Sequence, residues 1–208
     1  ADVPVVETFQ AAGVVSRDLE KDFFGRVGLF RNQPGDELLR RSDLVVAVGY
    51  DAIEYEPRNW NAERDARIIV VDDEVAEIDH NFEPETQLVG DIAQTLDFLL
   101  PYLRGYQPEM DSQEYLNSLQ HRLQDRDLPP ELTNDQVVTH PLHIISELQN
   151  HVDDDMTVTV DVGSHYIWMA RHFRSYEPRH LLFSNGMQTL GVALPWAIAA
   201  ALVRPDKK

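Results

Sequence analysis

Apolar runs alternate with helical patterns along the first half of the chain. Four apolar runs predict strands, at residues 3–9, 44–50, 67–72 and 87–91. The run at 44–50 is continuous, which is typical of a strand buried on both faces. Helical patterns at 34–41 and 91–103 follow strands, and Asp91 can cap the second of them. Strands separated by helices are joined by right-handed crossovers, so the pattern predicts an α/β fold with a parallel sheet.

The second half of the chain is organised differently. Residues 105–139 have no strand pattern, and prolines flank a polar helical stretch at about 111–126. A second β/α pattern follows, with helices at 140–152 and 164–173 and strands at 156–160 and 181–183. Thr139 can cap the first of these helices. We therefore expect a Rossmann-like central domain at 1–104, an interdomain connector at 105–139 and the beginning of a second α/β domain at 140–208.

The last apolar stretch, residues 190–203, is too short to cross a bilayer, which takes about 18–20 residues, and it contains Gly191 and Pro195. We expect a buried helix there. A sheet of two parallel strands cannot bury both of its faces, so we expect the second domain to be truncated. The chain also begins with neither Met nor a signal peptide pattern, and we expect it to be a piece of a longer protein.

Charge and composition exclude several classes of function. Lys and Arg total 18 against 36 Asp and Glu, which gives a net charge of −18. A surface this acidic repels nucleic acid and anionic lipid, so we expect neither nucleic-acid nor membrane partners. The chain has no Cys, which excludes disulfides, thiol catalysis and thiolate zinc sites. The absence of Cys fits a reducing compartment, and we expect a cytoplasmic protein.

Two candidate loops follow neighbouring strands of the second domain. In residues 161–165, Gly163 precedes a helix, where free N–H groups can approach a diphosphate. The residues alone favour the alternative, a tight turn with Ser164 as the N-cap. Residues 184–191 surround apolar side chains with turn formers, and the alternative here is an ordinary loop leading into a buried helix. Loops at the carboxyl ends of neighbouring parallel strands converge on one crevice.

Other polar clusters in the sequence do not form a complete metal site or a catalytic pair. The pairs His140/His143 and His165/His172 have spacings that can share a helix face, but no carboxylate or thiol completes a ligand set in the sequence. Ser164 and His165 are adjacent on a predicted helix and point about 100° apart, so they do not form a nucleophile–base pair. We therefore expect no metal site at these histidines.

Four sequence runs resemble the catabolic acetolactate synthases, a group of thiamine-diphosphate-dependent enzymes. They are residues 5–10 (VVETFQ), 25–36 (GRVGLFRNQPGD), 163–169 (GSHYIWM) and 184–198 (SNGMQTLGVALPWAI). The resemblance covers essentially the whole chain. It implies an internal fragment that contains most of the central domain, the connector and the first part of the diphosphate-binding domain.

The resemblance also implies a set of cofactor-binding residues. Gly163, Ser164 and His165 would contact the diphosphate of thiamine diphosphate. Gly186 would allow close approach, Gln188 would offer its backbone carbonyl to the amino group of the cofactor, and Leu190 would be the apolar wedge beneath it. The activating glutamate lies in a preceding domain of the family. The segment that holds Mg²⁺ would follow Lys208. The resemblance therefore implies no catalytic and no metal-ligating residues within this chain, and the 208-residue chain alone is expected to be inactive.

The implied reaction condenses two molecules of pyruvate to 2-acetolactate and carbon dioxide through a cofactor-bound hydroxyethyl carbanion. The full-length enzyme would bind thiamine diphosphate and Mg²⁺ and would associate as a homodimer or homotetramer. Residues 31–35 and 51–54 depart from the flavin-binding pattern of anabolic relatives, so FAD is not expected and a role in acetoin or butanediol formation is favoured. Two alternatives stay open: a related 2-oxoacid decarboxylase or carboligase, and a non-catalytic Rossmann-like scaffold domain.

Overall fold

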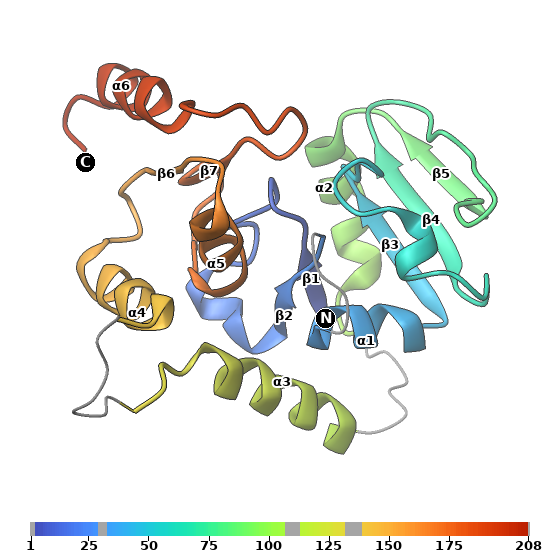
Figure 1. The fold of residues 1–208 in the computed structure, drawn as a ribbon. Coiled ribbons are helices and arrows are strands. Elements are labelled where there is room, and N and C mark those ends of the chain that lie inside the picture. The colour runs from blue at the N-terminus through green and yellow to red at the C-terminus, as the bar shows by residue number, and fades with distance from the viewer. Residues whose placement is uncertain (1–2, 29–32, 107–112, 132–138, 208) are drawn as a thin grey trace.

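The structure of the protein is a computed structural model that describes residues 3–28, 33–106, 113–131 and 139–207. It is a mixed α/β fold in which every pair of strands within a described sheet is parallel (Figure 1). The strands are β1 (Val5–Glu7), β2 (Phe23–Arg26), β3 (Leu44–Val48), β4 (Arg67–Asp72), β5 (Thr86–Val89), β6 (Val158–Val160) and β7 (Leu181–Phe183). The α/β class with parallel sheets is therefore confirmed.

Six α-helices and two 3₁₀ helices connect or cover these strands in the described residues. The α-helices are α1 (Pro34–Arg41), α2 (Ile92–Leu103), α3 (Gln113–Asp127), α4 (Pro141–His151), α5 (Ser164–His172) and α6 (Ala193–Val203). The 3₁₀ helices are Arg17–Asp22 and Pro57–Asn59. Asp91 caps α2 as the sequence predicts, because its side chain accepts a hydrogen bond from the Gln94 amide at 2.8 Å. The cap of α4 is His140 and not Thr139, since the His140 ring accepts from the Leu142 amide.

The strands form three separate sheets, with orders β1-β2, β3-β4-β5 and β6-β7. The strand β2 was not predicted, because its sequence Phe-Phe-Gly-Arg is too short and too mixed to give a period. The prediction that the run at 44–50 is buried on both faces is wrong. Leu44, Val46 and Val48 alternate along β3, so they share one face of the strand, and they are 38%, 53% and 44% exposed, whereas Ala47 on the opposite face is buried.

The described residues form four hydrophobic clusters, of which two are large. The first lies against the β3-β4-β5 sheet and contains Val27, Ala47, Tyr55, Trp60, Ile68, Val70 and Phe82. The second surrounds β6, β7 and α5 and contains Phe9, Ala12, Ile145, Val160, Tyr166, Met169, Ala170, Phe173, Leu181 and Phe183. Phe9 and Ala12 follow β1, so the beginning of the chain supplies part of the core of the C-terminal part. Helix α3 packs against α1 and β2 through Leu116, Leu119 and Leu123.

The final helix, α6, projects from the C-terminal part of the molecule (Figure 1). It forms where the sequence predicts a helix, but the expected burial is wrong, because none of its residues is buried. Leu194 and Leu202 are 69% and 77% exposed. Among its contacts, α6 packs against β6. No helix in the described part of the chain is long and apolar enough to cross a membrane.

Candidate functional site

The two predicted loops lie at the same edge of the β6-β7 sheet. The strands pair in parallel register, Val158 with Leu181 and Val160 with Phe183, so the chain leaves both strands at their carboxyl ends side by side. The first loop runs through residues 161–163 into α5. The second, residues 184–192, leads into α6 and is called the 184–192 loop below.

Gly163 forms the entry to α5. It is the N-cap of the helix, with φ of 155°, a conformation that favours glycine. A Cβ atom at this position would lie 2.8 Å from the His165 ring. Ser164 is the first residue of the helix and not its N-cap, so the turn is not the serine-capped one that the residues alone favour. Ser164 and His165 are both exposed, and the helix N-terminus that they form is open to an anion.

The 184–192 loop is a compact turn closed by its own backbone. The Gln188 amide donates to the Ser184 carbonyl at 3.1 Å, and the Thr189 amide donates to Ser184 Oγ at 3.2 Å. Gln188 has a φ of 46°, unusual for a residue other than glycine. Residues 186–190 are all exposed, and Leu190 is 77% exposed. The loop therefore presents backbone groups and apolar side chains outward.

Asp161 joins the two loops. Its Oδ1 atom accepts hydrogen bonds from the amides of Val162 and Gly191, both at 2.8 Å, and its Oδ2 atom accepts from the Ala193 amide at 3.2 Å. The backbone N–H of Gly191, followed by that of Val162, holds the pKa of Asp161 below its usual range, because both stabilise the charged form. Asp161 thus fixes the far end of the 184–192 loop to the first loop.

A buried polar chain holds the near end of the 184–192 loop. The Tyr166 hydroxyl donates to Asn185 Oδ1 at 2.7 Å, and Asn185 Nδ2 donates to Glu54 Oε1 at 3.3 Å. Glu54 belongs to the central part of the molecule, between β3 and the 3₁₀ helix Pro57–Asn59. Sequence reasoning missed Glu54 as a contact of the loop, because residues 54 and 185 meet only through the tertiary fold.

The arrangement fits one end of a diphosphate cofactor. The open N-terminus of α5 offers uncharged N–H donors, which suit an anion within a strongly acidic chain. A Cβ atom at Gly186 would meet nothing within 4 Å, so a ligand can approach the backbone there. Gly163, Ser164 and His165 are brought together with Gly186, Gln188 and Leu190 at one sheet edge by the pairing of β6 with β7 and by Asp161.

Metal ligation has no support from the described residues. No group of three or more His, Asp or Glu side chains there is arranged to hold an ion. His140 caps α4 and packs edge-on against Trp168. His172 stacks on the Trp168 ring, and its Nδ1 atom lies 2.7 Å from Asp127 Oδ1. These histidines therefore have structural contacts.

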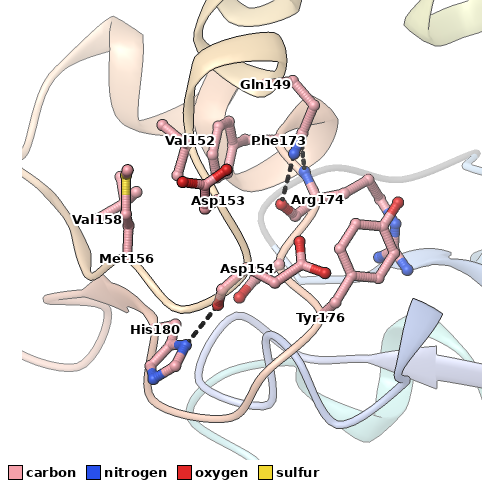
Figure 2. Close-up of a pocket in the computed structure, with 11 residues that line it drawn as sticks. Gln149, Val152, Asp153, Asp154, Met156, Val158, Phe173, Arg174, Tyr176 and His180 are labelled. Atoms are coloured by element: carbon pink, nitrogen blue, oxygen red, sulfur yellow. Dashed lines mark hydrogen bonds between the residues drawn. The ribbon is translucent and has the colours of Figure 1, made fainter. Parts of the chain in front are cut away.

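A small cavity lies away from both loops, between α4, β6 and the segment that follows α5. It has a volume of about 10 Å³, room for one water molecule at most. Figure 2 shows the Gln149 side chain bonded to the backbone of Arg174, and the His180 ring bonded to the Asp154 carbonyl oxygen at 2.7 Å. This cavity is a packing gap beside the turn that precedes β6.

The larger pocket, about 420 Å³, is open and lined in part by arginines of α3 and α5. Arg122 forms a bidentate ion pair with Glu37 at 2.6 and 2.7 Å. Arg126 and Arg171 both donate to the side-chain oxygen of Gln33. Because these cations already have protein acceptors, the pocket does not compete with the two loops as an anion site.

Comparison with known proteins identifies the family. The model of the thiamine pyrophosphate enzyme central domain matches residues 1–99. The model of the C-terminal TPP binding domain of thiamine pyrophosphate enzymes matches residues 161–208, which include both loops. The chain belongs to the thiamine pyrophosphate enzymes.

Among curated proteins, the similar ones include acetolactate synthases. The chain is 51% identical over 207 residues to the acetolactate synthase of Bacillus subtilis, covering 99% of the chain and 36% of that protein. It is 42% identical over 213 residues to the catabolic acetolactate synthase of Raoultella terrigena, covering 95% of the chain and 35% of the relative. The large subunit of isozyme 1 from Escherichia coli is 27% identical over 212 residues, covering 100% of the chain and 36% of the relative. The chain spans about a third of the length of these relatives.

Proposed function

We propose that this chain is part of an acetolactate synthase that condenses two molecules of pyruvate to 2-acetolactate and carbon dioxide. The observation that carries the proposal is the pair of loops at the ends of β6 and β7, joined by Asp161. Its support from comparison is the pair of relatives named acetolactate synthase, at 51% and 42% identity. The proposed domain bounds are 1–104 for the central domain, 105–139 for the connector and 140–208 for the diphosphate-binding domain.

Each loop has a proposed role toward thiamine diphosphate. Gly163, Ser164 and His165 bind the diphosphate at the N-terminus of α5. Gly186 leaves space for the cofactor, Gln188 accepts a hydrogen bond from its amino group through the backbone carbonyl, and Leu190 supports its ring system. The bound cofactor supplies the electron sink for decarboxylation. The exposed apolar surface of Leu190 orients the cofactor and keeps water from its reacting end.

The activity test uses the full-length protein with pyruvate, thiamine diphosphate and Mg²⁺. We expect acetolactate as the product, detected by its acid conversion to acetoin. Release of acetaldehyde without acetolactate would instead support a related 2-oxoacid decarboxylase, and the absence of any pyruvate consumption would support a scaffold domain. The 208-residue chain assayed alone should form no acetolactate above a buffer blank, because the activating glutamate and the Mg²⁺ segment are proposed to lie outside it.

Flavin provides a separate test of the catabolic assignment. Residues 51–54 depart from the flavin-binding pattern, and Glu54 within them is buried against Gln10 and Asn185. The other departing segment, 31–35, is described only from Gln33, and residues 31–32 lie outside the described residues. We expect the purified full-length protein to be colourless and its activity to be independent of added FAD. A stoichiometric flavin absorbance would contradict the catabolic assignment.

We also propose that the full-length enzyme is a cytoplasmic homodimer or homotetramer. Support comes from apolar surface that stays exposed on this chain: Phe98 and Tyr102 on α2 are 68% and 75% exposed, and Val203 on α6 is 80% exposed. Light scattering of the full-length protein during size-exclusion chromatography measures the mass directly. A monomeric mass across the micromolar range would contradict this proposal.

A further inference from the structure

Glu54 is a buried carboxylate that contacts two distant segments of the chain. The residue is 8% exposed. Its Oε2 atom accepts a hydrogen bond from the Gln10 amide at 3.2 Å, just after β1. Its Oε1 atom accepts from Asn185 Nδ2 at 3.3 Å, at the start of the 184–192 loop. Buried polar groups are normally hydrogen-bonded, and these two donors make Glu54 a defined polar junction between the two segments.

The direction of every hydrogen bond in the junction is fixed by chemistry. An ionised carboxylate only accepts, so Asn185 must turn its NH₂ group toward Glu54 and its oxygen toward Tyr166. The Tyr166 hydroxyl completes the chain by donating to that oxygen. Burial, followed by the negative charge of Glu54, raises the pKa of Tyr166, which keeps this donor protonated. Asn185 therefore has one orientation.

Asn185 and Ser184 are the buried residues of the loop, and residues 186–190 beyond them are exposed. The orientation of Asn185 therefore sets how the exposed part leaves β7. The junction lies beside Phe9, Tyr166 and Phe183, whose rings pack at 5.2–5.9 Å between centroids. This packing gives the polar chain a rigid base.

We propose that Glu54 is a positioning residue of the central domain that holds the cofactor-binding 184–192 loop through Asn185. The proposal rests on the proposed function, because it takes the loop to bind thiamine diphosphate. None of the proposed cofactor-binding residues belongs to the central domain. Through Glu54, this domain nevertheless determines the geometry of the site.

The donor–acceptor order suggests an exchange experiment. In Asn185→Asp, two carboxylates would face each other where 3.3 Å now separates a donor from an acceptor, so the pair either repels and displaces the loop or must take up a proton, and both weaken the junction at neutral pH. In the double variant Glu54→Gln/Asn185→Asp, the new amide at position 54 donates to the new carboxylate at position 185 and accepts from the Gln10 amide. The Tyr166 hydroxyl still donates to the carboxylate. All three hydrogen bonds and the single negative charge are restored with the positions exchanged.

The experiment measures the dissociation constant of thiamine diphosphate by calorimetry in the full-length protein with Mg²⁺, together with the melting temperature. We expect Asn185→Asp to raise the dissociation constant about tenfold, and the double variant to return it to within about threefold of wild type. Glu56→Gln is the matched control. Glu56 is an exposed acid on the same segment, paired with Arg58, and its neutralisation should leave the dissociation constant unchanged.

The outcomes separate the two proposals. If wild-type protein does not bind thiamine diphosphate, the proposed function fails, and the positioning role fails with it. If wild type binds and Asn185→Asp lowers the melting temperature without changing the dissociation constant, Glu54 is structural and the positioning role alone is overturned. A double variant as weak as Asn185→Asp also overturns it. If Asn185→Asp does not fold, Glu54→Gln replaces it, because an amide at position 54 can accept from the Gln10 amide but then turns its NH₂ group toward the Asn185 NH₂ group. We expect the dissociation constant to rise about threefold, and no rise would refute the role.

Discussion

Among the contacts between the central part of the molecule and its C-terminal part, two junctions differ in what holds them. At the first, Arg26 of β2 donates to the carbonyl oxygens of Ala170 and Phe173 at 2.8 and 3.2 Å and pairs with Glu7 at 3.2 Å. The side chains of Arg26 and Glu7 are 2% and 0% exposed. At the second, buried Glu54 reaches a loop whose residues 186–190 are all exposed.

The difference separates stability from binding. The first junction ties β1, β2 and α5 together through a buried ion pair. At the second junction, Glu54 fixes one end of the 184–192 loop through Asn185, and Asp161 fixes the other end. Residues 186–190 between these ends stay exposed. Substitutions at the first junction should therefore change the free energy of unfolding, whereas substitutions in the exposed loop should change binding and catalysis.

The largest expected effect is that of Arg26→Ala. It leaves Glu7 buried without its nearest cation and leaves two carbonyl oxygens at the end of α5 without a donor. We expect the free energy of unfolding to fall by about 3–5 kcal/mol, measured by chemical denaturation. Arg17→Ala is the control, because its ion pair with Asp154 is exposed and should contribute less than about 1 kcal/mol. Equal losses in the two variants would contradict the distinction between the junctions.

Leu190→Ala tests the exposed part of the 184–192 loop, which the second junction holds at one end. If Leu190 served only in core packing, its truncation would cost about 2–5 kcal/mol. With 77% of Leu190 exposed, we expect instead a change within about 0.5 kcal/mol in the unfolding of this chain. In the full-length enzyme, kcat should fall severalfold because the residue supports the reactive arrangement.

Leu190→Met is the matched variant for that experiment. Its side chain has nearly the same volume, so both kcat and the melting temperature should stay close to wild type. An unchanged kcat per folded molecule in Leu190→Ala, measured beside its melting temperature, would remove the cofactor role from this residue.

Local signals explain which elements the sequence predicts well. The predicted bounds 34–41, 67–72 and 181–183 match α1, β4 and β7, because breaker residues or charges flank a short run with one clear period. The convergence of the two loops also follows from the strand order, since parallel strands end at one edge. The sequence therefore indicates where the candidate site lies.

Burial and long-range contacts are harder to predict. The apolar runs of β3 and α6 indicate burial, yet Val46 is 53% and Ile198 54% exposed, because burial depends on which elements pack over a run and not on the run itself. Glu54 has no distinguishing neighbours in sequence, and its partner Asn185 is 131 positions away. The contacts that hold the candidate loop are therefore visible only in the folded chain.

The smallest expected effect is the loss of the Asp161 hydrogen bonds when its carboxylate is protonated at low pH. Its backbone donors stabilise the carboxylate, so its pKa in the folded protein lies below the ordinary value of 3.8. A group with a lowered pKa contributes stability that is present above the unfolded-state value and is lost as the pH falls through the folded-state value. The bonds to the amides of Gly191 and Ala193 should therefore be intact at neutral pH and weaken only below about pH 3.8.

Amide proton chemical shifts measure this transition at the two donors. In wild type, the Gly191 and Ala193 signals should titrate together with a midpoint below 3.8. In Asp161→Asn, the side-chain oxygen can still accept from Gly191, but its NH₂ group faces the Ala193 amide, and neither signal should titrate in this range. A wild-type midpoint at or above 3.8 would mean that the carboxylate gains nothing from its donors.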